Sequence, residues 1–546
     1  MKKSIKYLSV LFLVAVISSC SDIIDLNSES NIIADNYYTN YTELQAGLTA
    51  CYKGMQDPLT EEWSLTELRS DNAVMDGGSS TSTPNHDLAF LDQFYPSTTH
   101  QGLYKYWLKT YNNVKNTNTV LNAAGANYNK TTGVIEYEPV TINATAFECK
   151  SIAAEASFIR AYHYFNLVRL YGGVFLIDEP ISAEQAKTIN RSTDADIYKL
   201  IEADLKNTIA NGKNNTFTAN ASDLGHANAW AAKALLAKVY LTLNRKIEAA
   251  ELLNNITDNT PLPAYYQSIN LGVSGYSLQS TYESVFSINN EMNSEILFAI
   301  RFKAGGLGLG NPLSNLFAPT NSGLAVINGD GKGYNTPTLE ITKSNSAYTN
   351  YIDPSTVRKA VNIGLYGTST YYVKKYISPT ALANDAENDW PVIRYSDVLL
   401  MKAEANGNST ASMTIINQIR TRAGITTPLA TTATLAVFEK ALASERRWEF
   451  AFENQRWFDI LRFATTTTSL SASTDAFPNL KLQGAEYVMK KHFANMYSKI
   501  YFGFSVLPIS LSELQANSNL YRFLLPIPQY EIDTNSFITI QQNPSY

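Results

Sequence analysis

The chain has 546 residues, 45% of them hydrophobic, which is enough for one large domain or two to three ordinary ones with a substantial core. Only 17% of residues are charged, the net charge is −6 and no basic run occurs, which argues against nucleic acid as a partner because phosphates are met by clustered Lys and Arg. Asn, Thr, Ser and 34 Tyr predict a polar, weakly charged surface rich in aromatic hydroxyls.

The first twenty residues, MKKSIKYLSVLFLVAVISSC, are typical of a secretory signal. A basic head precedes an apolar stretch at 7–17, which is too short to span a bilayer comfortably. The end of this stretch, ISSC, resembles the lipobox of bacterial lipoproteins, in which the cysteine is acylated and becomes the first mature residue. The alternative is a chance thiol beside an ordinary cleavage site. We expect lipidation at Cys20, and several fatty chains, because one chain binds a membrane only marginally.

Helical periodicity begins after a polar tether that follows Cys20, with the first helix near Thr42. It recurs in six segments, at 102–121, 149–171, 193–209, 226–256, 395–423 and 434–463. One segment has the spacing of a tetratricopeptide unit, with Asn244 where a glycine is common. Its matching positions are Leu236, Ala237, Tyr240, Ala249 and Leu253. The sequence therefore predicts a mainly α fold built from helical hairpins.

The remaining segments interrupt this helical scaffold. Between 257 and 394 the chain is rich in Gly, Pro, Ser, Asn and Tyr, with short β-like runs such as EILFAIRF. A second irregular region is expected at 464–546. We predict a single domain over 21–546, with its scaffold at about 42–256 and 395–463. Loops on such a scaffold are where binding surfaces usually lie.

Familiar catalytic signatures are missing: the sequence has no HExxH, P-loop, nucleophile elbow or CxxC. The five histidines are scattered, so spacing indicates neither a metal cluster nor a Ser-His pair. The glycines of AGGLGLGNP are followed by Asn311-Pro312 and not by a helix that could hold an anion, which favours a flexible loop. Cys51 and Cys149 could pair or stay free. No catalytic residue, metal or cofactor is expected.

The stretch SERRWEFAFENQRWFDILRF, at 444–463, concentrates charge among aromatic rings. On a helix, Glu445, Glu449 and Glu453 are neighbours at i, i+4, which is unfavourable for like charges. We expect them to face arginines, either Arg456 or groups of neighbouring helices, because a lone buried ion is too costly. Rings that should pack beside them are Trp448, Phe452 and Phe458. A catalytic alternative requires an open cleft, and nothing nearby in the sequence indicates one.

Nearly the whole chain resembles the SusD/RagB family of outer-membrane nutrient-binding lipoproteins from the Bacteroidota. The segments that carry the resemblance are ASERRWEFAFENQRWFDILRF, AEASFIRAYHYFNLVRLYGGVFLIDEP, WPVIRYSDVLLMKAEANG, NQIRTRAG and the terminal LLPIPQYEIDTNSFITIQQNPSY. The resemblance implies a tetratricopeptide-like helical fold with an irregular ligand-binding face. It also implies a lipid-anchored, non-enzymatic protein of the outer membrane, on the cell surface, that hands oligosaccharides or polysaccharides to a TonB-dependent, SusC-like transporter.

Ligand contacts are expected in loops that the family uses for binding, here within 61–78, 90–97 and 272–284. Sugar rings stack on aromatic side chains while polar groups bind their hydroxyls. The stacking candidates are Trp63, Phe94, Tyr95 and Tyr276, and the polar candidates are Arg69, Asp71, Asn72 and Asp76. Each has a structural alternative: Trp63 could belong to the core, Phe94 and Tyr95 could anchor their loop, and Arg69 and Asp71 could pair with each other. Trp107 and Tyr111 are assigned to packing.

Three other functions stay open at this point. Some relatives of the family serve peptide uptake, so the ligand could be a peptide. A surface glycosidase would need two carboxylates flanking an open cleft. A purely structural scaffold would associate with the transporter and bind no small ligand. Incubation with a glycan panel separates these functions by retention, by product formation, or by indifference to glycans.

Overall fold

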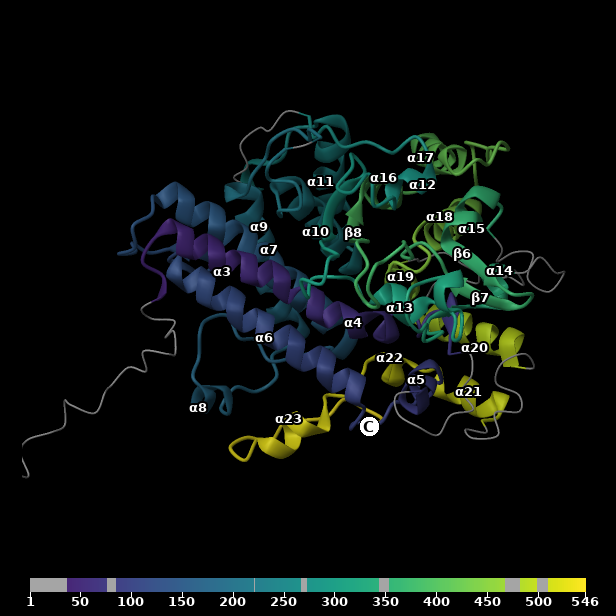
Figure 1. Ribbon diagram of the computed structural model, residues 1–546. Coiled ribbons are helices and arrows are strands. Elements are labelled where there is room, and N and C mark those ends of the chain that lie inside the picture. The colour runs from purple at the N-terminus through teal and green to yellow at the C-terminus, as the bar shows by residue number, and fades with distance from the viewer. Residues whose placement is uncertain are drawn as a thin grey trace, which may run out of the picture.

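The computed structural model describes residues 37–75, 85–219, 221–266, 273–342, 353–466, 482–497 and 509–546. Within them the chain is mainly helical with short strands, which confirms the predicted fold class (Figure 1). The signal segment, Cys20 and Asp76 lie outside the described residues. In the described part of the chain, no helix is both long and apolar enough to cross a membrane.

Helix α7 forms the centre of the N-terminal half, and nearly every residue from Cys149 to Tyr171 is buried. It begins at a capping box in which the Thr145 hydroxyl accepts from the Glu148 amide while the Glu148 carboxylate accepts from the Thr145 amide. A helix that is buried all round must be covered on every side. Its bounds and those of its neighbours are α3 (Tyr41–Gly54), α4 (Gln56–Leu65), α6 (Gln101–Ala123), α7 (Ala146–Tyr171) and α9 (Asp194–Asn211).

Two helical hairpins extend this scaffold: α10 (Ala229–Thr242) with α11 (Lys246–Asp258), and α16 (Tyr395–Asn406) with α17 (Thr410–Arg422). Asn244 has a positive φ of 57° and so makes the turn between α10 and α11, a role that asparagine tolerates better than most residues. The five tetratricopeptide-like positions named above are all buried. The helical-hairpin prediction is thus confirmed, with each long periodic segment divided by a turn.

Paired strands and short helices lie in the segment between the hairpins and also in the chain before them. Strand β4 (Ile296–Ile300) pairs antiparallel with β8 (Trp390–Arg394), which joins the start of the insertion to its end. The other antiparallel pairs are β1 (Ala73–Val74) with β5 (Thr336–Pro337), β2 (Ala126–Asn129) with β3 (Val134–Tyr137), and β6 (Ile363–Tyr366) with β7 (Thr370–Val373). Short helices are α8 (Ala183–Ala186), α12 (Tyr282–Val285), α13 (Leu313–Phe317), α14 (Leu339–Thr342) and α15 (Thr356–Asn362), with 3₁₀ turns at Ala264–Tyr266 and Gly323–Ala325.

The predicted helix at 434–463 is wrong in one respect, because it is two helices. Helix α18 covers Leu435–Glu449 and α19 covers Arg456–Thr466. Between them Phe452 and Asn454 have positive φ values of 65° and 57°, which a helix cannot accommodate. The break places Glu453 in a turn, so Glu449 and Glu453 are not neighbours on one helix face.

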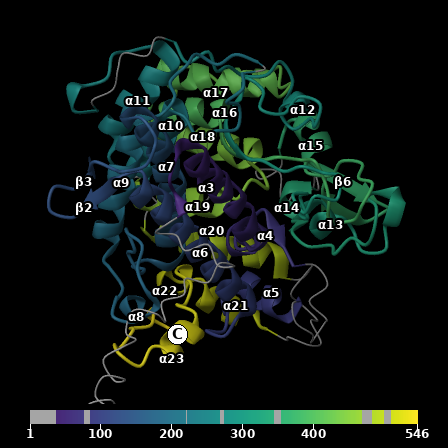
Figure 2. The ribbon, with the colours of Figure 1, turned by 60° about the vertical axis from the view of Figure 1, so that its left-hand side comes forward.

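The C-terminal part, expected to be irregular, contributes further helices. They are α20 (Leu482–Met496), α21 (Leu511–Asn517), α22 (Leu520–Phe523) and α23 (Gln529–Thr534). Figures 1 and 2 both place α21, α22 and the C-terminus at the same end of the molecule as α5 (Asn85–Asp92). Segments more than 400 residues apart in the chain therefore form one surface there. Cys51 and Cys149 are buried free thiols.

Candidate functional site

The charged stretch at 444–463 forms a buried ion-pair network. Arg394 is its hub: its Nη1 lies 2.7 Å from Glu295 Oε1 and 3.0 Å from Glu449 Oε1, and its Nε lies 2.9 Å from Glu453 Oε2. Arg358 lies 2.5 Å from Glu445 and 3.2 Å from Glu449. All of these side chains are almost completely buried. The carboxylates therefore meet arginines of other elements, and not Arg456 as one alternative had it.

A second group of pairs continues the network toward the N-terminal helices. Arg446 lies 2.8 Å from both Asp397 and Asp459. Arg456 lies 2.7 Å from Asp71, whose second oxygen is 3.3 Å from Arg447. Asp71 thus follows helix α4 yet is held by arginines of two helices far along the chain, Arg447 of α18 and Arg456 of α19.

Electrostatics agrees with a structural role for these groups. Burial alone would raise the pKa of Glu449, but Arg422, Arg394 and Arg358 outweigh burial and lower it to about 2. Such a carboxylate stays ionised and hydrogen-bonded, so it neither stores nor transfers a proton near neutral pH. The structural interpretation of the 444–463 stretch is confirmed, because its charged residues are buried together and joined in ion pairs.

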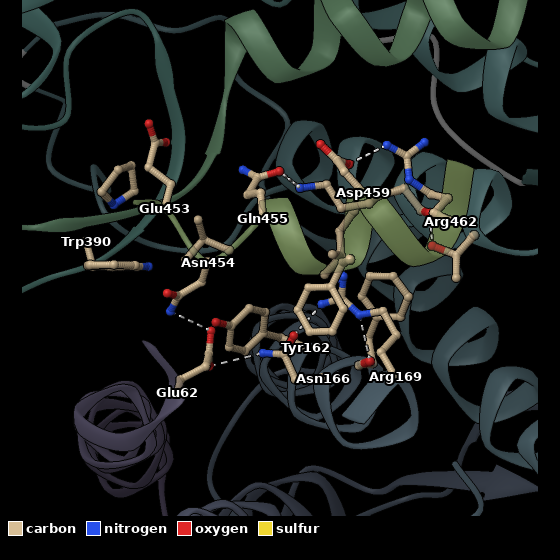
Figure 3. Close-up of a pocket in the computed structure, with 17 residues that line it drawn as sticks. Glu62, Tyr162, Asn166, Arg169, Trp390, Glu453, Asn454, Gln455, Asp459 and Arg462 are labelled. Carbon is tan, nitrogen blue, oxygen red and sulfur yellow. Dashed lines mark hydrogen bonds and ion pairs between the residues drawn. The ribbon is translucent and has the colours of Figure 1, made fainter. Parts of the chain in front are cut away.

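A small polar cavity lies beside this network (Figure 3). It has a volume of about 50 Å³ and is lined by groups that include Glu62, Asn454 and Arg169. The Arg169 guanidinium is held between the rings of Phe165 and Phe458, at 3.8 and 3.6 Å from their centroids. This space fits one or two water molecules and is far below the roughly 300 Å³ of a ligand pocket. We therefore assign it to internal hydration.

The carboxyl group of Glu62 makes this cavity sensitive to pH. Burial raises its pKa to about 7, although Asn454 and Arg169 counteract this shift. Its Oε1 accepts from Asn454 and its Oε2 from Asn166 at 3.3 and 3.4 Å, both long hydrogen bonds. The folded protein thus keeps a proton on Glu62 that the unfolded chain releases above pH 4.5. This contribution to stability is fully present below pH 4.5, is lost as pH rises toward 7, and does not change further above 7.

Replacing Glu62 with Gln, which mimics the protonated acid, is expected to remove this dependence. At pH 8 the free energy of unfolding of Glu62→Gln should exceed that of the wild type by up to about 3 kcal/mol, and at pH 4 the two should agree. Urea denaturation at several pH values measures the difference. The control Glu61→Gln, which alters the adjacent and more exposed carboxyl, should keep the wild-type profile; equal profiles for both variants would contradict the assignment.

Most of the sequence-predicted ligand residues that the structure describes lie in the interior. Trp63 is buried against Phe317 and Tyr334, with ring centroids 5.6 and 5.7 Å apart. Tyr276 is buried too, and its hydroxyl accepts from the Asn228 amide at 3.0 Å. Trp63 therefore has the core role that was its alternative, and Tyr276 is also part of the interior.

The polar candidates are buried as well, and they are occupied by internal partners. Asn72 accepts from Arg447 at 2.8 Å and donates to Glu67 at 3.0 Å. Asp71 pairs with arginines as described above, so the alternative in which it pairs with Arg69 is wrong. The Arg69 guanidinium instead donates to the carbonyls of Arg522 and Phe523, both at 3.0 Å.

Arg69 binds helix α22 through the two carbonyl groups named above. Its guanidinium lies 5.3 Å from the ring centroid of Phe94 and 4.7 Å from that of Trp457. In the described part of the chain its Nε and Nη1 have no hydrogen-bond partner, and burial lowers its pKa to about 10. Cation–π contacts and two carbonyls therefore compensate its charge.

Phe94 and Tyr95 differ in exposure although they are adjacent, and Phe94 has a positive φ of 55°. Phe94 is completely buried against Trp457, Phe493 and Phe523, so it anchors its loop. Tyr95 is 51% exposed. Among the candidates that the structure describes, Tyr95 alone presents its ring to solvent.

Tyr95 belongs to a run of neighbouring side chains at the surface, which we call the aromatic ladder and define as His86, Phe90, Tyr95, Arg522 and Tyr546. Successive centres are 4.5, 6.1, 4.4 and 5.8 Å apart along this order. Helix α5 and the loop after it supply the first three members, and α22 and the C-terminus supply the last two. Tyr521, which is 63% exposed, lies next to Arg522 in the chain. Sequence reasoning missed the C-terminal members, because only the fold brings them to α5.

The ladder can bind flat, uncharged ligand surfaces. Its rings and guanidinium offer π faces, and apolar C–H surfaces stack on such faces. In the described part of the chain, no group of three or more His, Cys, Asp or Glu is arranged to hold a metal ion.

Comparison with known proteins places this chain among SusD-like sequences. A family model described as "SusD family" matches residues 325–546, and one described as "Starch-binding associating with outer membrane" matches 24–241. A SusD-like protein of Bacteroides ovatus is 25% identical over 492 residues, covering 84% of this chain and 82% of its own. SusD-like protein P25 of Formosa agariphila is 26% identical over 411 residues, covering 67% and 71%.

Solved structures with the same fold cover nearly the whole chain. A laminarin binding SusD-like protein superposes with a TM-score of 0.67 at 22% identity, covering 93% of this chain and 100% of its own. Surface glycan-binding protein A from Bacteroides thetaiotaomicron, in complex with laminarihexaose, gives a TM-score of 0.65 at 18% identity, covering 92% and 99%. At these identities the likeness establishes the fold.

Proposed function

Because the chain belongs to the SusD family, we propose that it is a non-enzymatic, lipid-anchored protein of the outer membrane that binds oligosaccharides and delivers them to a TonB-dependent transporter. The family description associates such proteins with starch binding and the outer membrane. Two proteins of the same fold are described as binding laminarin or as holding laminarihexaose. The lipobox-like segment that ends at Cys20 supports the anchor, and the transporter follows from the family resemblance.

The observation that carries the glycan-binding proposal is the aromatic ladder. A sugar ring presents an apolar C–H face that stacks on Tyr95, and successive rings of an oligosaccharide extend along the neighbouring members. Nothing in such capture requires covalent chemistry, which fits the burial of the charged network away from solvent. Asp76, outside the described residues, and the other sequence candidates remain proposals as ligand contacts.

Tyr95→Ala is expected to weaken oligosaccharide binding about 10-fold, because it removes the most exposed ring of the ladder, a loss of roughly 1.4 kcal/mol. Isothermal titration with laminarihexaose and a panel of neutral hexaoses measures this change. Tyr265→Ala is a matched control, since Tyr265 is 55% exposed and lies outside the ladder. Equal affinities for the two variants would contradict the ladder as the binding surface.

The same panel tests the function itself. Retention of a glycan without cleavage supports the proposal, whereas release of shorter products would establish a glycosidase. Retention of peptides together with indifference to every glycan would establish peptide capture. Co-purification of the protein with the transporter from the outer membrane tests the proposed partner. If the lipid anchor is needed, Cys20→Ala should abolish this co-purification.

A further inference from the structure

A second cleft lies away from the aromatic ladder and shares none of its residues. It has a volume of about 360 Å³, which falls within the range of small-molecule sites. Three segments form its walls: the end of α3 with the start of α4, the loop before α10, and the end of β4. Because these segments belong to the rigid scaffold, the cleft is held open without a ligand.

Its floor is apolar. The lining includes Met55, Leu224, Ile300, Phe302 and Leu309. Met55, Ile300 and Phe302 are nearly buried, and Leu224 and Leu309 are half-buried at the edge. A surface of this kind favours the C–H face of a ligand over a fully hydrated ion.

Its polar side is organised by a buried carboxylate. Glu155 Oε2 accepts from the Tyr52 hydroxyl at 2.6 Å and lies 2.7 Å from His226 Nδ1, while the Tyr52 oxygen accepts from the Ala227 amide at 2.7 Å. In the neutral imidazole this fixes the proton on Nδ1. The His226 side chain is 42% exposed and lines the cleft. Its Nε2 has no partner in the described part of the chain, so it can accept a hydrogen bond from a ligand hydroxyl.

The charged groups around the cleft are already neutralised. Arg301 lies 3.1 Å from Glu291 and 2.6 Å from Asp389, and Lys53 lies 2.6 Å from Asp57. Lys303 pairs with Glu387. An anionic or cationic ligand would have to compete with these pairs, whereas a neutral one would not.

An additional acceptor comes from Gln56, which also lines the cleft. Its Nε2 donates to the Arg301 carbonyl at 2.6 Å, and its Oε1 is the acceptor of the same amide. We propose that this cleft is a second glycan subsite that holds one neutral sugar ring, with the C–H face on the apolar floor and hydroxyls on His226 Nε2 and Gln56 Oε1. The inference rests on the proposed function and names a further site and its ligand class.

The test fills the cleft without disturbing the core. Thr49 is exposed on α3, lines the cleft, and its hydroxyl donates only to the Gln45 carbonyl within its own helix. Thr49→Trp is expected to weaken binding of the best-retained neutral hexaose at least 5-fold by isothermal titration. Ala50→Trp, on an exposed neighbouring position outside the cleft, should match the wild type. His226→Phe, which keeps a ring of similar shape and removes the acceptor, should weaken binding about 3-fold or more.

The outcomes separate this inference from the proposed function. If the wild type retains no glycan of the panel, both are overturned. If Tyr95→Ala weakens binding and Thr49→Trp and His226→Phe leave it unchanged, the cleft subsite is overturned and the proposed function stands. If the cleft variants lose affinity for a hexapeptide and not for glycans, the ligand class is overturned. Loss of glycan affinity in both cleft variants, with circular dichroism and melting like the wild type, supports the subsite.

Discussion

Arg394→Met is expected to destabilise the fold by about 4 kcal/mol or more, because it leaves three buried carboxylates without their shared cation. Arg394 donates to Glu295, Glu449 and Glu453 and to the Glu449 carbonyl. Methionine fills much of the volume but supplies none of these donors. Urea denaturation of the purified variant at pH 7 measures the change in the free energy of unfolding.

Two further variants make this prediction decisive. Arg394→Lys keeps the charge with fewer, differently placed donors, so its free energy of unfolding should lie between those of the wild type and Arg394→Met. This variant also gives a measurable value if Arg394→Met does not fold. Lys199→Met breaks an exposed pair with Asp196 and should cost less than about 1 kcal/mol. An Arg394→Met protein within 1 kcal/mol of the wild type would show that the carboxylates do not depend on this cation.

The identity of Arg394 as the hub illustrates what the sequence can and cannot predict. Glu445, Glu449 and Glu453 stand close together among aromatic rings, so pairing with arginines could be predicted from the cost of lone buried ions. Their actual partners are up to 91 positions away, as Arg358 is from Glu449, and no periodicity encodes such distances. The helix break was also missed, because EFAFENQR contains neither Gly nor Pro and the tertiary contacts impose the positive φ at Phe452.

In the candidate site, too, the sequence predicts a region better than it predicts the exposure and partners of single residues. The sequence singled out the loop with Phe94 and Tyr95 as a region for ligand contacts, which stays a prediction, and the structure exposes only the Tyr95 ring of the two. Which of the two adjacent rings faces solvent depends on the backbone of Phe94, and sequence pattern says little about a single φ. Arg69 was a candidate because it lies in a segment that the family uses for binding, yet it is buried under α22 and donates to two carbonyls of that helix.

Acid is expected to unfold the protein cooperatively as pH falls below about 4. Among the network carboxyls, burial acts to raise each pKa, but arginines and Lys238 outweigh it at Glu449, Asp71 and Asp397 and hold their pKa values well below the ordinary range. The unfolded chain takes up these protons near pH 4, whereas the folded protein does not. The stability that they contribute is therefore present above pH 4.5 and is lost as pH falls toward 2.

Other carboxyls lower the stability as pH rises, and this determines the pH at which the protein is most stable. Burial raises the pKa of Glu62 and Glu67 to about 7, and it raises the pKa of Glu445 even beside Arg358. Their contribution is complete below pH 4.5 and is lost as pH rises toward 7. The melting temperature should thus be highest near pH 5 and fall steeply below pH 4. Since the pairs are buried, 0.5 M NaCl should move the acid midpoint little; a large shift with salt would mean that exposed charges control it.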